Sequence, residues 1–154
     1  MLQRSYPDQI CSISRALEVV GERWTLLILR DAALGLIRFD EFQASLGIAS
    51  NVLTNRLKLL VEEGVMERVP DDDRPGRPKY VLTDKGREIG PALIALMKWG
   101  DRHYPAQGGP PRLPTHTTCG GDVGVHLRCE RCGGDVGFDE LEVRPGPGLA
   151  AARA

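Results

Sequence analysis

The sequence predicts a mainly α-helical protein with one small β-hairpin, followed by a short cysteine-rich extension of β-ribbon type. Three observations support this fold class. Apolar residues recur at three- and four-residue steps over most of residues 9–104, as they do on the buried faces of helices. Two β-like segments, residues 65–69 and 79–82, flank a polar turn rich in proline. Three of the four cysteines lie close together, between positions 119 and 132.

Five helices are expected before the extension, over residues 9–20, 24–34, 38–47, 50–63 and 84–104. The second is apolar on most sides, so it is expected to be the buried central helix. Four side chains of capping type stand at helix starts and are expected to accept backbone hydrogen bonds there: Asp8, Asp40, Ser50 and Thr83. The large aromatic side chains Trp24, Tyr80 and Trp99 are expected in the core.

Composition divides the chain into four parts. Residues 8–104 are rich in Leu, Ile, Val and charged residues and predict the main folded domain. Residues 105–114 are dominated by proline and glycine, as in a linker. Residues 115–144 are rich in cysteine, histidine and glycine, and residues 145–154 predict a flexible tail.

Charge and hydropathy exclude some classes of protein. The chain has 154 residues, with 20 Lys and Arg against 21 Asp and Glu, so the formal net charge is −1. A uniformly basic coat for nucleic acid is therefore excluded, whereas a local basic face is not. No run approaches the roughly 20 apolar residues that span a bilayer, and the N-terminus lacks the apolar segment of a signal peptide. We expect a cytoplasmic protein without a membrane partner.

The order of helix, glycine turn, helix and charged hairpin is that of a winged helix-turn-helix. In residues 50–63, Leu53, Leu57 and Leu60 form a stripe that predicts the buried face. The opposite face carries side chains suited to base edges and phosphates: Ser50, Asn51, Thr54, Asn55 and Lys58. We therefore expect this helix to read the major groove of double-stranded DNA.

Arg56 lies beside the apolar stripe and has two interpretations. It contacts a DNA phosphate, or its stem packs in the protein and its guanidinium pairs with a carboxylate. The helical periodicity leaves both open.

The turn at residues 70–78 predicts the wing. Arg74, Arg77 and Lys79 are its candidate contacts to the DNA backbone, and Pro75, Gly76 and Pro78 shape its tip. The preceding acidic run, residues 71–73, favours the alternative of a solvated turn of mixed charge.

Residues 11–104, about three-fifths of the chain, resemble the HxlR-type winged-helix transcriptional regulators, relatives of the MarR group. The matching stretches are Cys11, ALEVVGERWTLLILRDAALGLIRFDEF, LTNRLKLLVEEGVMERV, KYVLTDKG and the helix that contains Trp99. The resemblance implies a homodimer formed by the N- and C-terminal helices of this region. It also implies binding to operator DNA with two-fold symmetry, and we expect a repressor.

Cys11 matches the position of an N-terminal cysteine with which some HxlR-like proteins sense oxidants, quinones or aldehydes. A cysteine in the first turn of a helix has a lowered thiol pKa, which favours the reactive thiolate. Cys11 is therefore the candidate sensor of a small-molecule or oxidant effector. The alternative is a buried, inert side chain.

The extension contains two similar motifs, His116-x2-Cys119-Gly and Cys129-x2-Cys132-Gly. Zinc prefers four such ligands in a tetrahedron, and a spacing of two residues lets one turn supply a pair of them. We expect His116, Cys119, Cys129 and Cys132 to bind a structural zinc ion. Alternatives are a Cys129/Cys132 redox pair, free thiols, or His126 in place of His116.

The sequence contains no phosphate-binding glycine loop, dinucleotide fingerprint or nucleophile elbow, so an enzyme is not expected. The leading hypothesis is a sequence-specific DNA-binding regulator. Two alternatives use Cys129 and Cys132 instead: a thiol-redox protein, and a zinc-ribbon module for protein interaction.

Overall fold

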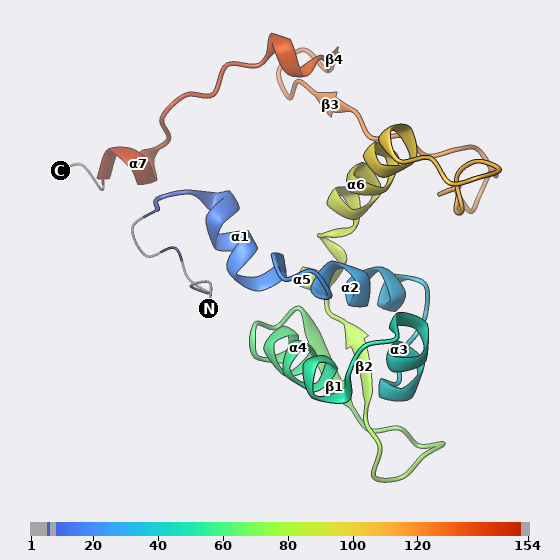
Figure 1. Ribbon diagram of the computed structural model, residues 1–154. Helices are drawn as coiled ribbons and strands as arrows, with labels where there is room; N and C mark the ends of the chain where they lie inside the picture. The colour runs from blue at the N-terminus through green and yellow to red at the C-terminus, as the bar shows by residue number, and fades with distance from the viewer. Residues whose placement is uncertain (1–5, 7–8, 152–154) are drawn as a thin grey trace. The chain divides into compact units, whose positions relative to one another are not determined.

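The computed structural model describes residue 6 and residues 9–151. The chain divides into two compact units, residues 1–90 and residues 91–154. The first unit contains α1 (Ser12–Val20), α2 (Thr25–Ala33), α3 (Phe39–Leu46), α4 (Ser50–Glu62), β1 (Met66–Val69), β2 (Lys79–Leu82) and α5 (Asp84–Arg87) (Figure 1). From the boundary onward follow α6 (Gly90–His103), β3 (Leu127–Arg128), β4 (Asp135–Val136), the 3-10 helix η1 (Phe138–Glu140) and α7 (Pro147–Ala151). The predicted class, mainly helical with one small hairpin, is confirmed for the first unit.

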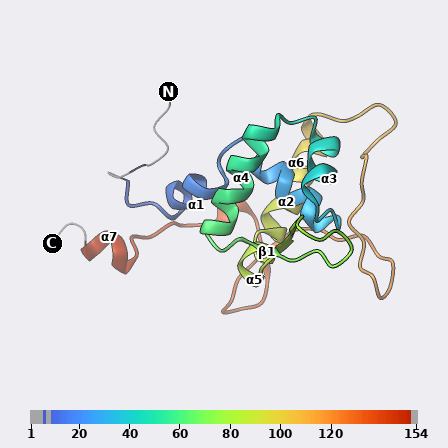
Figure 2. The same ribbon diagram turned by 90° about the horizontal axis from the view of Figure 1, so that it is seen from below.

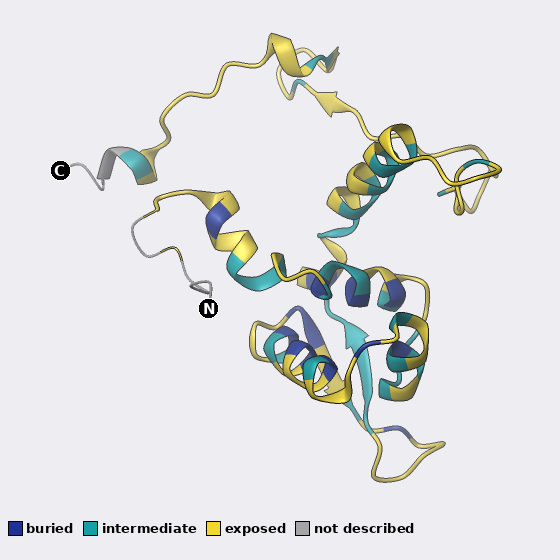
Figure 3. Ribbon diagram, viewed as in Figure 1, coloured by how far each residue is buried: buried dark blue, intermediate teal, exposed yellow. Residues whose placement is uncertain are grey.

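The core of the first unit lies where α2, α3, α4 and β1 meet, as Figure 3 shows. α2 packs on α3 and β2, and α4 packs on β1; Figure 2 shows the three helices as one cluster. The predicted stripe of Leu53, Leu57 and Leu60 is buried, as are Ile28 and Phe42. Burying a side chain of this size stabilises the fold by about 1.5–3 kcal/mol. The apolar stripe therefore fixes which face of α4 remains in solvent.

The hairpin is antiparallel, with Met66 opposite Leu82 and Val69 opposite Lys79. The amide of Tyr80 also donates a hydrogen bond of 2.7 Å to the carbonyl of Ile37, just before α3. β2 is thus hydrogen-bonded along both edges, to β1 on one and to Ile37 on the other. The loop that joins β1 to β2, residues 70–78, projects from the hairpin beyond α3 and α4 (Figure 1), and we call it the wing.

The last predicted helix is wrong in extent, because it is two helices. Thr83 caps α5 as expected: its Oγ1 accepts from the amide of Gly86 at 3.1 Å. Pro91 ends the continuity. It has no N–H to donate to the carbonyl of Arg87, and its ring disfavours helical geometry before it. Proline is tolerated in the first turn of a helix, where it stands in α6.

Three helix starts differ from the predictions. α1 begins at Ser12 with Cys11 at its N-cap, and the predicted cap Asp8 lies outside the described residues. α3 has Arg38 at its N-cap instead of Asp40, because Glu41 Oε2 accepts from the amides of Ile37 and Arg38, each at 2.9 Å. α4 is preceded by Ala49, so Ser50 is its first residue and not its cap.

The C-terminal unit has little regular structure. The expected β-ribbon over residues 115–144 is limited to β3 and β4, which pair over two residues each, while residues 138–140 form η1. A second antiparallel bridge joins Thr115 to Asp122. Between residues 91 and 149, no residue is buried. The predicted tail includes α7, and residues 152–154 are outside the described part.

No helix among the described residues is both long enough and apolar enough to cross a membrane.

Candidate nucleic-acid interface

The solvent face of α4 presents a compact set of polar side chains. This polar face follows from the helical repeat, because residues four positions apart lie on the same side of the helix, and the leucines occupy the side that faces the core. All of its members are exposed: Ser50, Asn51, Thr54, Asn55 and Lys58. The structure thus brings together five of the six residues predicted on this helix.

Local hydrogen bonds hold the start of α4. Gln43 Nε2, on α3, donates to Ser50 Oγ at 2.8 Å, and Thr54 Oγ1 donates to the Ser50 carbonyl at 2.8 Å. Lys58 Nζ lies 3.6 Å from Glu62 Oε1, with both side chains largely in solvent. Such a pair contributes little free energy. Lys58 therefore remains able to contact an anion such as a phosphate.

Arg56 is the exception on α4. Its side chain is only 9% exposed, and its Nη2 lies 3.2 Å from Glu22 Oε1. Of the two roles considered for it, the structure favours the structural one. The guanidinium is thus placed as the structural alternative expects, and a contact between Arg56 and a DNA phosphate stays a prediction.

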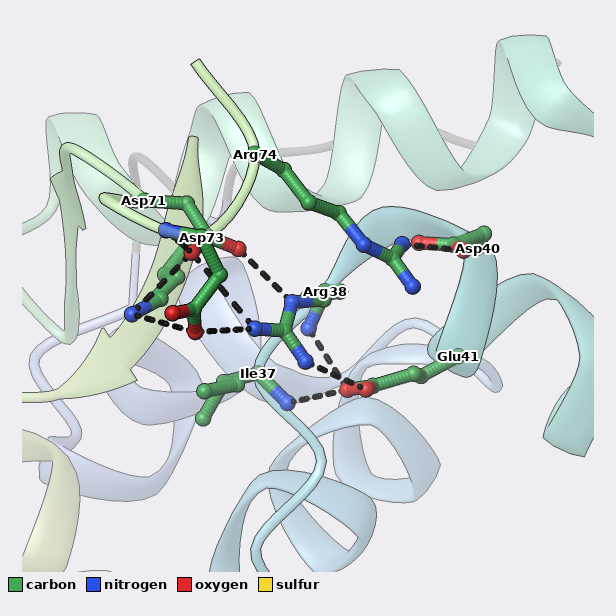
Figure 4. A network of polar contacts seen from close by, with 8 residues as sticks. Ile37, Arg38, Asp40, Glu41, Asp71, Asp73 and Arg74 are labelled. Atoms are coloured by element: carbon green, nitrogen blue, oxygen red, sulfur yellow. Dashed lines mark hydrogen bonds and ion pairs between the residues drawn. The ribbon is translucent and has the colours of Figure 1, made fainter. Parts of the chain in front are cut away.

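The wing is held down by a network of ion pairs around Asp71, shown in Figure 4. The Asp71 side chain is 1% exposed, with Arg38 Nε at 2.7 Å and Lys79 Nζ at 3.1 Å from its two oxygens. Arg38 Nη2 also pairs with Asp73 Oδ2 at 3.1 Å. The hydrogen bond from Arg38, followed by that from Lys79, holds the pKa of the Asp71 carboxyl far below its usual range. The base of the wing is therefore fixed in one position.

This network changes the interpretation of the wing cations. Lys79 points inward to Asp71 with 22% of its side chain exposed, so its ammonium group is already paired within the protein, and its contact with the DNA backbone stays a prediction. Arg74 Nη1 pairs with Asp40 Oδ2 at 2.8 Å, and that bond is the main reason for the lowered pKa of Asp40. Arg77 is exposed and makes no ion pair with the rest of the described chain.

A hollow of about 320 Å³ lies between the wing and the start of α3. Arg68, Arg74 and Arg77 line it together with Asp40 and Asp71. The side of the wing that carries Arg77 is thus continuous with further guanidinium groups, which makes it the more basic part of the wing.

Sequence reasoning missed Arg38, the residue that anchors the wing. Its main partner, Asp71, is 33 positions away, so no local spacing reveals the pair. Glu41, three positions after Arg38, was a usable signal, because a glutamate at the third helical position often reaches back to the N-cap amide.

Cys11 is exposed and lies at the N-cap of α1. The backbone amides of Ser14 and Ile13 lower the pKa of its thiol. Exposure and a stabilised thiolate are the two requirements for a reactive cysteine.

The predicted metal ligands lie in two separate turns, which we call knuckle 1 (residues 115–122) and knuckle 2 (residues 128–135). In knuckle 1, His116 Nδ1 lies 3.3 Å from Cys119 Sγ. In knuckle 2, backbone amides of Cys132 and Arg131, and then the Cys132 side chain, lower the pKa of Cys129. Over the described residues, no three His, Cys, Asp or Glu side chains converge on one metal position.

Comparison with known proteins shows to which family the chain belongs. A model of the HxlR-like helix-turn-helix family matches residues 19–108, more than half of its length. The chain belongs to the HxlR-like helix-turn-helix family. An uncharacterised HTH-type transcriptional regulator of Mycobacterium tuberculosis H37Rv is 45% identical over 143 residues, which are 93% of this HxlR-like chain and 90% of that protein. The family and its relatives are transcriptional regulators and not enzymes.

Solved structures agree with this membership. PA1607, a protein assigned as a transcription factor, is 38% identical with a TM-score of 0.80, covering 89% of this chain and 96% of that one. The redox regulator HypR in its reduced form is 27% identical with a TM-score of 0.56, covering 60% of this chain and 92% of that one. The winged helix-turn-helix is therefore common to both, whereas the likeness to PA1607 and to the mycobacterial regulator covers 89% and 93% of this HxlR-like chain and so includes most of its C-terminal unit.

Proposed function

We propose that this chain is a sequence-specific DNA-binding repressor that acts as a homodimer on an operator with two-fold symmetry. The observation that carries the proposal is the exposed polar face of α4, which lies in the same unit as a rigidly anchored wing. In this arrangement α4 enters the major groove and the wing follows the adjacent backbone.

Asn51 and Asn55 are the proposed base readers. An asparagine amide bonds both N6 and N7 of adenine, and each good pair of this kind is worth about 1–3 kcal/mol of discrimination. Ser50, Thr54 and Lys58 are proposed to contact phosphates or base edges and so to fix the register of the helix on the duplex.

Homodimer formation is supported by apolar side chains that lie in solvent on α1 and α6. Ile13 and Leu17 are 70% and 44% exposed on α1, and Leu96 and Trp99 are 51% and 52% exposed on α6. The expectation that Trp99 belongs to the core of the chain is thus wrong. Exposed apolar groups of this size favour an interface, and a second copy matches the family resemblance. Ile13→Glu should yield a monomer in analytical ultracentrifugation, whereas Arg15→Glu on the same helix should leave the dimer intact.

The base-reading proposal is tested by selecting binding sites from random duplexes. The wild-type protein should enrich a two-fold symmetric motif with half-sites about 10 base pairs apart, one helical turn. Asn51→Ala removes one such contact from each of two half-sites, about 2–6 kcal/mol in all, so it should bind the selected site at least about 30-fold more weakly, with unchanged affinity for random DNA. Glu63→Ala, beyond the far end of α4, is the matched control and should bind as wild type does. Equal losses on selected and random DNA for Asn51→Ala would refute the base-reading role.

We also propose that Cys11 makes DNA binding responsive to oxidants. Its exposure and lowered pKa support this role, as does the likeness to a redox regulator. Hydrogen peroxide should convert the Cys11 thiolate to a sulfenic acid and change operator affinity in the wild type and in Cys132→Ser. Cys11→Ser should not respond, and a response of that variant equal to wild type would exclude the sensor role.

A further inference from the structure

The two knuckles are copies of one sequence unit. Residues 119–124 read CGGDVG, and the same six residues recur at 132–137. The ligand-type residues His116 and Cys129 stand at the equivalent position, three before each repeated cysteine. The repeat places two metal-ligating side chains in each copy.

The backbone of the two copies is also the same. In knuckle 1, the amide of His116 donates to Gly121 O at 2.8 Å, and that of Gly120 donates to His116 O at 2.7 Å. In knuckle 2, the corresponding bonds from Cys129 to Gly134 and from Gly133 to Cys129 measure 2.9 and 2.8 Å. One antiparallel bridge closes each turn at its base, Thr115 with Asp122 and Arg128 with Asp135.

Glycine is required at the same places in both turns. Gly120 and Gly133 each have φ of +72°, a left-handed conformation that other residues adopt only with strain. A Cβ on Gly121 or Gly134 would lie 3.4 or 3.5 Å from the sulfur of the preceding cysteine. Each thiol is therefore folded back over its own turn.

The side chains of knuckle 1 already have the separation of two ligands on one ion. Zinc binds nitrogen at about 2.0–2.1 Å and sulfur at about 2.3 Å, so a tetrahedral angle places the two atoms about 3.6 Å apart. His116 Nδ1 and Cys119 Sγ are 3.3 Å apart. A small increase in the distance between Nδ1 and Sγ would give this pair the spacing of two of the four ligands of a tetrahedral zinc ion.

The residues around the two knuckles lack a buried core, so a cross-link would stabilise them. No residue between 91 and 149 is buried, and apolar side chains such as Val125, Leu127 and Phe138 lie in solvent. A small segment without an apolar core commonly depends on a metal or disulfide.

We propose that the two knuckles bind one zinc ion between them, with His116 and Cys119 as one pair of ligands and Cys129 and Cys132 as the other. The two pairs are separate in the structure, and the chain between Cys119 and Cys129 is long enough, at up to about 3.3 Å per residue, to let the second turn close onto the first. Metal binding is thus coupled to the ordering of residues 115–136. Four protein ligands leave no open position, so the zinc is structural.

The test uses the full-length, reduced protein stripped of metal by a chelator and titrated with Co²⁺ and then Zn²⁺. The expected result is one metal per chain by native mass spectrometry, with the visible absorption of tetrahedral thiolate-bound cobalt that Zn²⁺ displaces. Cys119→Ser, Cys132→Ser and His116→Ala should lose stoichiometric binding. The matched controls Cys11→Ser and His126→Ala carry the same changes outside the knuckles and should retain it.

A second measurement does not depend on the variants folding. Zn²⁺ should protect three of the four thiols of the wild-type protein from N-ethylmaleimide, leaving only Cys11 alkylated. Absence of metal binding, a Cys129–Cys132 disulfide in its place, one metal per two chains, or loss of binding in His126→Ala but not in His116→Ala would each overturn the proposal. None of these readouts involves DNA, so they are independent of the proposed repressor function.

Discussion

Replacing Arg77 by alanine should make DNA binding less sensitive to salt. Lys79, Arg38 and Arg74 already lie against carboxylates, whereas Arg77 has no ion pair among the residues described. It is therefore the wing cation whose contact with a phosphate displaces a counterion without first breaking a pair within the protein.

The size of the effect follows from counterion release. Each phosphate neutralised on duplex DNA contributes about 0.9 to the slope of log K against log salt concentration, so two copies of Arg77 in a dimer contribute about 1.8. Between about 50 and about 200 mM salt, the variant should lose roughly 12-fold less affinity than the wild type does. Selected and random DNA should show the same change, because phosphates carry no sequence information.

The assay is fluorescence anisotropy of a labelled duplex over a salt series. Arg87→Ala is the matched control, since Arg87 is exposed on α5, at the other end of β2 from the wing, and its loss changes the net charge equally. A slope that changes by less than about 0.3 in Arg77→Ala, or by the same amount in Arg87→Ala, would refute the assignment of Arg77.

Three further predictions concern the first unit. Gly86→Ala should lower the free energy of unfolding by about 3 kcal/mol in urea titrations, because its Cβ would lie 2.1 Å from the carbonyl oxygen of Val65. Asp71, whose pKa is lowered by Arg38, contributes stability that is complete above its ordinary pKa near 4 and is lost as pH falls toward its lowered value; urea midpoints between pH 7 and pH 2 measure this. Arg56→Met should fold and retain both the specificity and the salt slope of DNA binding, because a buried guanidinium does not contact DNA.

Each has a control. Gly90→Ala should change stability little, since nothing lies within 4 Å of its added Cβ. Asp72→Asn, next to the buried carboxylate but exposed, should keep the acid dependence that Asp71→Asn loses. A loss of salt slope in Arg56→Met equal to that of Arg77→Ala would restore Arg56 as a phosphate contact.

The sequence alone was sufficient to predict those parts of the fold whose interactions are local and repetitive. The leucine stripe of α4 predicted its buried face, and that face determines which polar residues are exposed. The turn propensities around Pro75 and Gly76 predicted the wing between two strands. Periodicity and turn chemistry act over a few residues, so one sequence is enough to detect them.

Prediction failed where the partner is distant in sequence. Nothing near Lys79 indicates that it faces Asp71, and nothing near Arg56 in the sequence indicates that its partner is Glu22, so the role of Arg56 was left open. The predictions of the helix starts failed for a related reason, because several polar residues compete for each capping position. Glu41 takes the capping role expected of Asp40 because its carboxylate reaches back to two backbone amides.

The inward-facing charges of the wing bear on how the protein searches a genome. A wing with three unmatched cations would attract every phosphate backbone, and such a protein would remain for long periods on unrelated sequences. Here Asp71 and Asp40 neutralise much of that charge before DNA is met, and the whole chain has a net charge of −1. Weak attraction to random DNA raises the ratio of specific to non-specific binding, which decides occupancy when competing sites are numerous. If α4 reads DNA as proposed, the ion pairs that fix the shape of the wing would also leave discrimination mainly to the uncharged amides and hydroxyls of α4.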